Sequence, residues 1–179
     1  MLTFFIVLVL AWQYYIGYSR GLLLQAAYTV GSLLSLFLAS LFYKPLSDFL
    51  YLWIPYASPA EGDKSYFFDE QHLFNLDKVF YAGIAFFILY LLFYSLIRFL
   101  GIFLHLFDFD RLDKQVRTRY LAGALSVLIT WLGMAMLLTI AATIPATPVQ
   151  DYLHKSLMAK LMINTPIFSS LLQNLWLIQ

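Results

Sequence analysis

The sequence predicts an all-α, polytopic membrane protein with four transmembrane helices followed by amphipathic C-terminal helices. Composition is the first reason: 62% of the 179 residues are apolar and only 12% are charged, which is too hydrophobic for an ordinary water-soluble domain. The second reason is length, because the chain holds four long apolar runs and a spanning helix needs about 20 residues. The chain has no cysteine, so disulfides and thiolate chemistry are excluded.

The expected organisation is a transmembrane domain over residues 1–144 and an amphipathic tail over 145–179. A cleaved signal peptide is the alternative to a first span. No Lys or Arg precedes Arg20, however, and no small-residue cleavage pattern follows the first apolar run, so a retained span is favoured. This segment is short, and a re-entrant or tilted helix stays open as an alternative. The four spans are expected at about 2–18, 22–43, 79–97 and 120–144, with an extracytoplasmic loop at 44–78.

A polar elbow, GYSRG, joins the first two spans. Its glycines, Gly17 and Gly21, stand four residues apart, a spacing that can pack two helices together. Beside Ser19 and Arg20 at the end of a span, they more strongly indicate a tight turn. The charged residues expected to contact a partner or anionic lipid are Arg20, Arg111, Lys114, Arg117 and Arg119.

Small residues recur every four positions in the second span, at Ala27, Gly31, Ser35 and Ala39. In a helix they share one face, and a second helix can approach that face closely. The last span also begins with small residues. We therefore expect Gly123 and Ser126 of that span to pack against this small-residue ladder.

Weakly polar residues inside the spans have two interpretations. Interhelical hydrogen bonding is the simpler one, and the wall of a polar path is the alternative. Arg98 ends the third span, where its side chain can extend to the lipid headgroups, although a buried ion-pathway charge remains the alternative. The candidates for a polar path are Gln25, Thr29, Ser32, Arg98 and Thr130.

Pro45 is expected to end the second helix, because proline cannot continue the hydrogen-bonded ladder. A short helix in the membrane interface is expected to follow between Pro45 and Pro55, anchored by Trp53. Further along, Asp69, Glu70 and His72 suggest a metal site only weakly, and a solvated loop face is favoured. We expect no cofactor and no metal.

The tail begins with a capping box from Thr147 to Gln150, with proline at the first helical position. It starts a helix that is interrupted near Pro166, and a second helix is expected over 167–178. Neither helix is long enough to span a bilayer. The apolar residues that the first helix is expected to bury are Val149, Leu153, Leu157 and Leu161.

The basic residues also predict the orientation. Arg20, Arg98 and the basic residues of 108–119 share one side, which the positive-inside rule places in the cytoplasm. Both termini are then outside, unless the first segment does not span.

Several motifs together resemble the bacterial colicin V production (CvpA) family: the elbow GYSRG, the segment LAGALSV at the start of the fourth span, and the tail from Ser156 to Pro166. The family's elbow corresponds to Gly17, Arg20 and Gly21. The resemblance implies a four-span inner-membrane protein linked to bacteriocin production or export and to envelope function, with no established enzymatic activity. Thr3 and Gln25 stand where family members often carry acidic residues, which puts a proton-linked role at those positions in doubt.

Three classes of function follow from these observations. The first is a non-enzymatic membrane protein that assists bacteriocin or toxin production or export and envelope function. The alternative is a small homo-oligomeric channel or transporter subunit. An enzyme is the weakest, because His72, His105 and His154 lie in three separate segments and form no catalytic constellation. The expected partners are the lipid bilayer and a second copy or an envelope or secretion protein, but no nucleic acid.

Overall fold

The computed structural model describes residues 1–56, 66–67, 76–101 and 116–165. Within these residues the chain forms helices and no strand, which confirms the all-α prediction. The helices are α1 (Leu2–Arg20), α2 (Leu22–Trp53), α3 (Leu76–Gly101), α4 (Val116–Ala142), α5 (Thr147–His154) and α6 (Leu157–Ile163).

Four of these helices, α1 to α4, are long and apolar enough to cross a membrane. Their most apolar windows are only 11% to 39% buried within the protein, so most of that apolar surface points outward. A bilayer is as apolar as a protein core, and outward apolar surface is therefore what a membrane-spanning bundle presents. The division into a domain at 1–144 and a tail at 145–179 stays a prediction.

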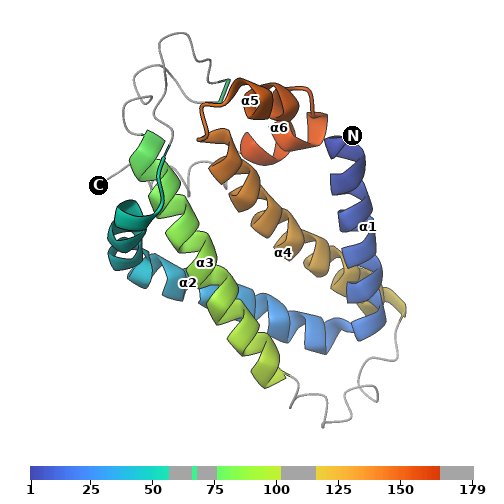
Figure 1. The fold of residues 1–179 in the computed structure, drawn as a ribbon. Helices are drawn as coiled ribbons and strands as arrows, with labels where there is room; N and C mark the ends of the chain where they lie inside the picture. Colours follow the sequence, from blue (N-terminus) through green and yellow to red (C-terminus); the bar gives the residue numbers. More distant parts are fainter. Residues whose placement is uncertain (57–65, 68–75, 102–115, 166–179) are drawn as a thin grey trace.

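The helices associate mainly in two pairs, α2 with α3 and α1 with α4 (Figure 1). Helix α4 also contacts α2 and α3, and so it connects the two pairs. The short helices α5 and α6 lie at the end of the bundle where α1 begins and α4 ends (Figure 1). The opposite end holds the connection between α1 and α2, and we refer to it as the elbow end.

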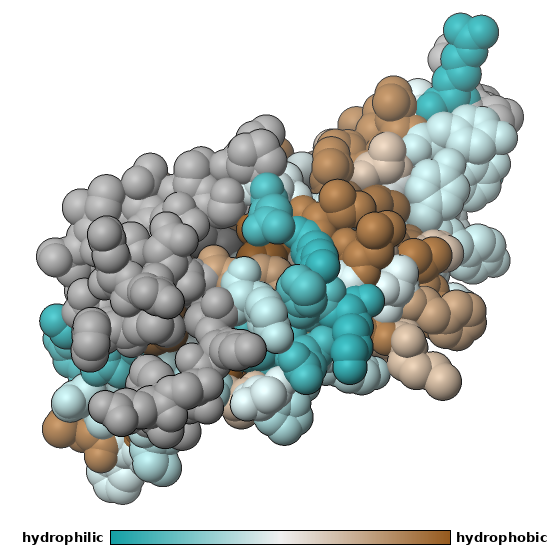
Figure 2. All heavy atoms as spheres, turned by 90° about the horizontal axis from the view of Figure 1, so that it is seen from above, coloured by the Kyte–Doolittle hydropathy of each residue, from teal (hydrophilic) through white to brown (hydrophobic). Residues whose placement is uncertain are grey.

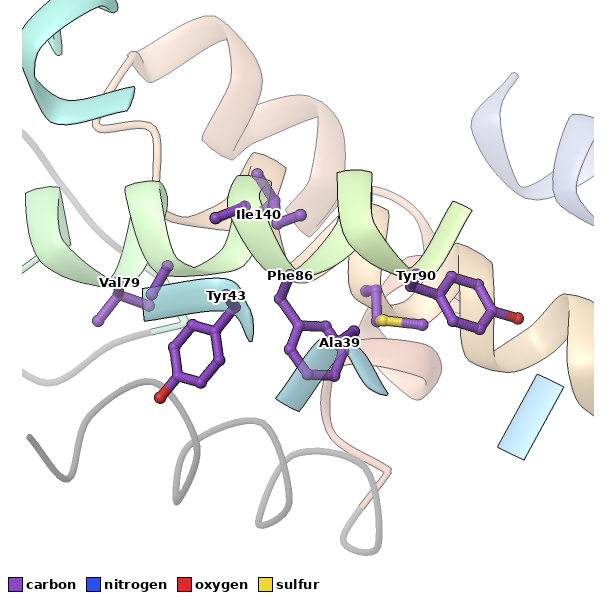
Figure 3. Close-up of a cluster of buried hydrophobic side chains, with 9 residues drawn as sticks. Ala39, Tyr43, Val79, Phe86, Tyr90 and Ile140 are labelled. Atoms are coloured by element: carbon purple, nitrogen blue, oxygen red, sulfur yellow. The ribbon is translucent and has the colours of Figure 1, made fainter. Parts of the chain in front are cut away.

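A cluster of buried side chains holds α2, α3 and α4 together (Figure 3). Phe86 of α3 lies at its centre and meets Tyr43 of α2 edge to face, with ring centroids 6.0 Å apart. Ile140 contributes from α4. In lipid, close van der Waals packing of this kind is a principal force between helices.

The prediction that Pro45 ends the second helix is wrong, because α2 continues to Trp53. Proline removes one hydrogen bond and crowds the preceding turn, but membrane helices tolerate it where neighbouring elements compensate. Here Leu46 and Leu50 pack against the cluster around Phe86, which holds the second part of α2 in place. Trp53 is exposed and lies at the end of this continuous helix rather than in a separate one.

The tail helix is divided, contrary to the prediction of one helix up to the Pro166 region. Ser156 ends the first part and caps α6, because its hydroxyl accepts a hydrogen bond from the Ala159 N–H at 3.3 Å. This restart turns Leu157 and Leu161 outward, although both were expected to be buried, and Leu153 alone of the predicted set is fully buried. The predicted helix at 167–178 lies outside the described residues.

A second cluster of buried side chains joins α5 and α6 to α1 and α4. Ile6 of α1 and Met162 of α6 are both fully buried there, and the Thr3 and Ser156 hydroxyls lie 2.9 Å apart. Figure 2 shows this end of the molecule, where hydrophilic surface adjoins a hydrophobic flank. The tail therefore closes this end of the α1/α4 pair.

Candidate functional site

The two glycines of the elbow have different roles. Gly21 connects α1 and α2 with φ 84°, a backbone conformation that side chains rarely allow, so it is a turn glycine as expected. Gly17 instead packs against α4. A Cβ atom on Gly17 would lie 2.4 Å from the Ser126 Cβ and 2.7 Å from the Ala122 carbonyl oxygen, and the turn prediction was therefore wrong for this residue.

The small residues do not pair as the sequence suggested. The ladder residues Gly31, Ser35 and Ala39 are buried, but a Cβ on Gly31 would meet Ile97 of α3 at 2.6 Å. Gly123 of α4 packs against Tyr14 of α1 instead. The expected pairing of Gly123 and Ser126 with the ladder is wrong, because α3 occupies the ladder face and α1 occupies the small-residue face of α4.

A cavity of about 240 Å³ lies among the four long helices. Three of the five residues predicted for a polar path line it, namely Gln25, Arg98 and Thr130. Arg20 of the elbow and Ser126 of α4 line it as well. The structure thus brings together residues from four helices.

Both arginines of the cavity lie against one aromatic ring. The guanidinium carbons of Arg20 and Arg98 are each 5.4 Å from the centroid of the Tyr28 ring, within the range of a cation–π interaction. Arg98 also lies 5.8 Å from the Tyr94 ring. Tyr28 is 5% exposed and packs against Gly101, where any side chain would meet its ring.

This arrangement concentrates positive charge. The two guanidinium groups share one ring, so they can be no farther apart than twice the ring-to-cation distance, and like charges repel at that range. Among the described residues that line the cavity there is no carboxylate. The electrostatic field in this part of the cavity therefore favours an anion.

Gln25 adds an unused polar group to the cavity. It is 2% exposed, and its side-chain Oε1 has no hydrogen-bond donor among the described residues. A buried acceptor without a donor costs about 1–3 kcal/mol, so a ligand or water is expected to supply one. The backbone carbonyl of Gln25, by contrast, accepts from the Thr29 hydroxyl at 2.8 Å.

The other polar-path candidates are engaged inside the bundle. Ser32 and Tyr90 are joined by their hydroxyls at 2.9 Å, which links α2 to α3. The Thr130 hydroxyl donates to the Ser126 carbonyl at 2.9 Å. Ser32 therefore forms a hydrogen bond between helices, as the simpler interpretation predicts, whereas Thr29 and Thr130 form hydrogen bonds within their own helices.

Several predicted residues lie away from the cavity. Arg117 and Arg119 are exposed in the first turn of α4, and Ala27 is half-buried. The rest fall outside the described residues: Arg111, Lys114, Asp69, Glu70, His72 and His105. His154 is described and stacks on Tyr66, with ring centroids 4.4 Å apart.

The sequence reasoning did not identify the aromatic residues of the site. Tyr94 and Arg98 stand four apart on α3, a spacing that places them on one helix face and was a readable signal. Tyr28 offered no comparable signal, because both of its cations come from other helices. No group of three or more metal-binding side chains occurs in the described part of the chain.

Comparisons with known proteins agree with this architecture. Residues 2–166 match the family described as Colicin V production protein. The chain is also 32% identical to YshB of Bacillus subtilis (strain 168), described as an uncharacterized transmembrane protein, over 177 residues that cover 98% of this chain and 97% of that protein. No solved structure matches. The chain therefore belongs to the colicin V production protein family.

Proposed function

We propose that this chain is a non-enzymatic, multi-pass protein of the bacterial cytoplasmic membrane that assists toxin production or export and supports the cell envelope. The observation that carries this proposal is the family match over residues 2–166. The family's description favours a role in toxin production, and the four apolar helices favour a location in the membrane.

The charge at the start of α4 supports a contact with a partner on the elbow side. Arg117 and Arg119 are exposed in the first turn of this helix, and no acidic residue accompanies them there. The positive end of the helix dipole disfavours cations at a helix N-terminus. Their placement is therefore better explained by membrane orientation or by an acidic partner than by helix stability.

A deletion strain tests this function. In a host that carries a bacteriocin operon, we expect loss of the gene to reduce secreted toxin activity and to increase dye uptake through the envelope. Wild-type protein and Lys44→Gln should restore both, whereas Arg117→Gln combined with Arg119→Gln should not. Normal secretion and a normal envelope barrier in the deletion strain would contradict the proposal.

A transporter or channel subunit is the second candidate. The observation that favours it is the convergence of Gln25, Arg98 and Thr130 on one cavity. The small-residue ladder supports an oligomeric channel less than expected, because Gly31 at its centre packs against α3 of the same chain.

Flux through purified protein in liposomes tests the second candidate. We expect Thr130→Leu to reduce any ion or solute flux by narrowing the cavity, whereas Leu128→Met on the exposed surface of the same helix should not. The absence of flux from the wild-type protein would remove this candidate.

A further inference from the structure

The cavity changes character along its length. Arg20, Gln25 and Arg98 line its elbow end, close to the points where α1 and α3 finish and α2 begins. Farther from the elbow the lining is mostly apolar, with Phe87 and Leu91 from α3 and Leu137 from α4, although Gln13 and Tyr90 also line it. The cavity is therefore cationic at its elbow end and mostly apolar farther from the elbow.

The apolar part of the cavity reaches the outer surface of the bundle. Leu91 and Leu137 line the cavity, yet they are 44% and 52% exposed. Both belong to helices that are apolar enough to cross a membrane. An amphiphile could therefore keep its chain among lipids while its polar head occupies the elbow end.

The polar groups of the cavity define the chemistry of that head. Two guanidinium groups, with no carboxylate among the described lining residues, suit a phosphate, to which arginine donates charge-assisted hydrogen bonds. The Oε1 of Gln25, which has no donor among the described residues, is an acceptor and so suits a ligand with a hydroxyl or amine donor. A choline or ethanolamine head would place a third cation beside the two arginines, and like charges repel.

We propose that this cavity is a binding site for an anionic glycerophospholipid whose head combines a phosphate diester with a free hydroxyl, the chemistry of phosphatidylglycerol. The phosphate lies between Arg20 and Arg98, the head hydroxyl donates to Gln25, and the first part of an acyl chain lies along Leu91 and Leu137. A volume of about 240 Å³ suits a headgroup with the start of a chain, since whole drug-sized ligands occupy pockets of about 300–1,000 Å³.

The first experiment measures lipid selectivity with the purified full-length protein in a neutral detergent. Short-chain phosphatidylglycerol and phosphatidylcholine are titrated separately, and bound lipid is counted by native mass spectrometry. We expect phosphatidylglycerol to bind about tenfold or more tightly, because choline adds a positive charge beside the arginines and has no hydroxyl to donate to Gln25. Equal affinity for the two lipids would overturn the proposal.

Variants that each remove one positive charge test whether the lipid binds in this cavity. Arg20→Gln and Arg98→Gln should each weaken phosphatidylglycerol binding by about tenfold. Lys44→Gln is the matched control, since it removes the same charge from an exposed position on α2 that does not line the cavity. If the three variants bind alike, the lipid lies elsewhere on the protein.

A cavity-filling variant separates a lipid from a soluble phosphate. Gly133 lines the cavity, and a Cβ there would meet nothing within 4 Å, so Gly133→Leu is expected to add bulk to the cavity. It should weaken phosphatidylglycerol binding, while Gly133→Ala should change it little. Glycerol phosphate that binds the wild-type protein as tightly as the short-chain lipid would identify a soluble ligand and reject the lipid.

This inference does not depend on the proposed role in toxin production. Loss of lipid selectivity together with a clear secretion defect in the deletion strain would reject the lipid site alone. Selective lipid binding in a strain that secretes normally would reject the secretion role alone.

Discussion

Two buried glutamines show how differently the two ends of this bundle are built. Gln150 and Gln25 are 1% and 2% exposed, and each lies at one end of the long helices. The Gln150 Nε2 donates to the carbonyl oxygens of Ala142 and Ile144 at 2.7 and 2.9 Å, and its Oε1 accepts from the Tyr66 N–H at 3.3 Å. The Oε1 of Gln25 accepts nothing from the described residues.

The two glutamines differ in their hydrogen bonds. Both polar atoms of the Gln150 side chain bond within the protein, whereas the acceptor of Gln25 has no donor among the described residues. Gln150 supplies hydrogen bonds that the C-terminal carbonyls of α4 cannot obtain within their own helix. It thereby closes the end of the bundle that α5 and α6 cover. Gln25 lines the cavity at the elbow end together with two arginines, and its acceptor has no donor among the described residues.

The largest effect should come from Gln150→Leu. This change removes the hydrogen bonds to Ala142 at the end of α4 and to Ile144 just after it, which we expect to cost roughly 2–4 kcal/mol. The thermal midpoint of the protein in detergent should fall by roughly 5 to 10 °C. An unchanged midpoint would show that Gln150 does not hold this end together.

A smaller loss is expected from Gly17→Ala at the elbow end. The added Cβ would press on Ser126 and on the Ala122 backbone, and overpacking of this kind costs about 1–3 kcal/mol. Gly133→Ala on α4 is the control, because it enters open space and should stabilise the helix by up to about 1 kcal/mol. Thermal unfolding of the two variants checks this contrast, and midpoints that shift in the same direction would contradict it.

The closed end should also lose stability at high pH through Tyr56. Its hydroxyl donates to the Thr143 carbonyl at 2.7 Å, and burial, followed by the nearby Asp77, raises the pKa of Tyr56 to about 12 from 10.0. A raised folded-state pKa means that the contribution is complete below pH 10 and is lost as the pH rises toward 12.

Tyr56→Phe tests this alkaline loss. The variant should be less stable than the wild type at pH 8, because the hydrogen bond to Thr143 is gone. Its stability should then decline less between pH 10 and pH 12. Parallel stability curves for the two proteins over that range would refute the role of this hydroxyl.

The smallest effect on stability is expected from Gln25→Leu. Replacing a buried acceptor that has no donor among the described residues with an apolar group of similar size should be nearly neutral or slightly stabilising. The thermal midpoint should therefore stay within about 2 °C of the wild type. A loss as large as that of Gln150→Leu would show that Gln25 is structural and would end the contrast between the two glutamines.

Local sequence patterns predicted much of the fold. The four spans were predictable because hydropathy adds up over about 20 neighbouring residues, whatever the rest of the chain does. The turn at Gly21 was predictable because its backbone conformation is a property of glycine itself. The helical tail was predictable from its periodicity, although the break at Ser156 was not.

Family membership also followed from local motifs, and the match over residues 2–166 confirms it. The sequence by itself thus determined the class of protein, the number of long helices and the position of the elbow.

The tertiary structure alone decided which helices meet. Small residues occur on both α2 and α4, and nothing local shows that α3 packs on Gly31 or that α1 packs on Gly123. It also decided that α2 continues past Pro45, since packing of Leu46 and Leu50 compensates for the proline. The meeting of Arg20 and Arg98 at Tyr28, and the different surroundings of Gln25 and Gln150, depend on how each helix is rotated about its axis. That rotation is set by contacts between segments far apart in the chain, which a local pattern does not contain.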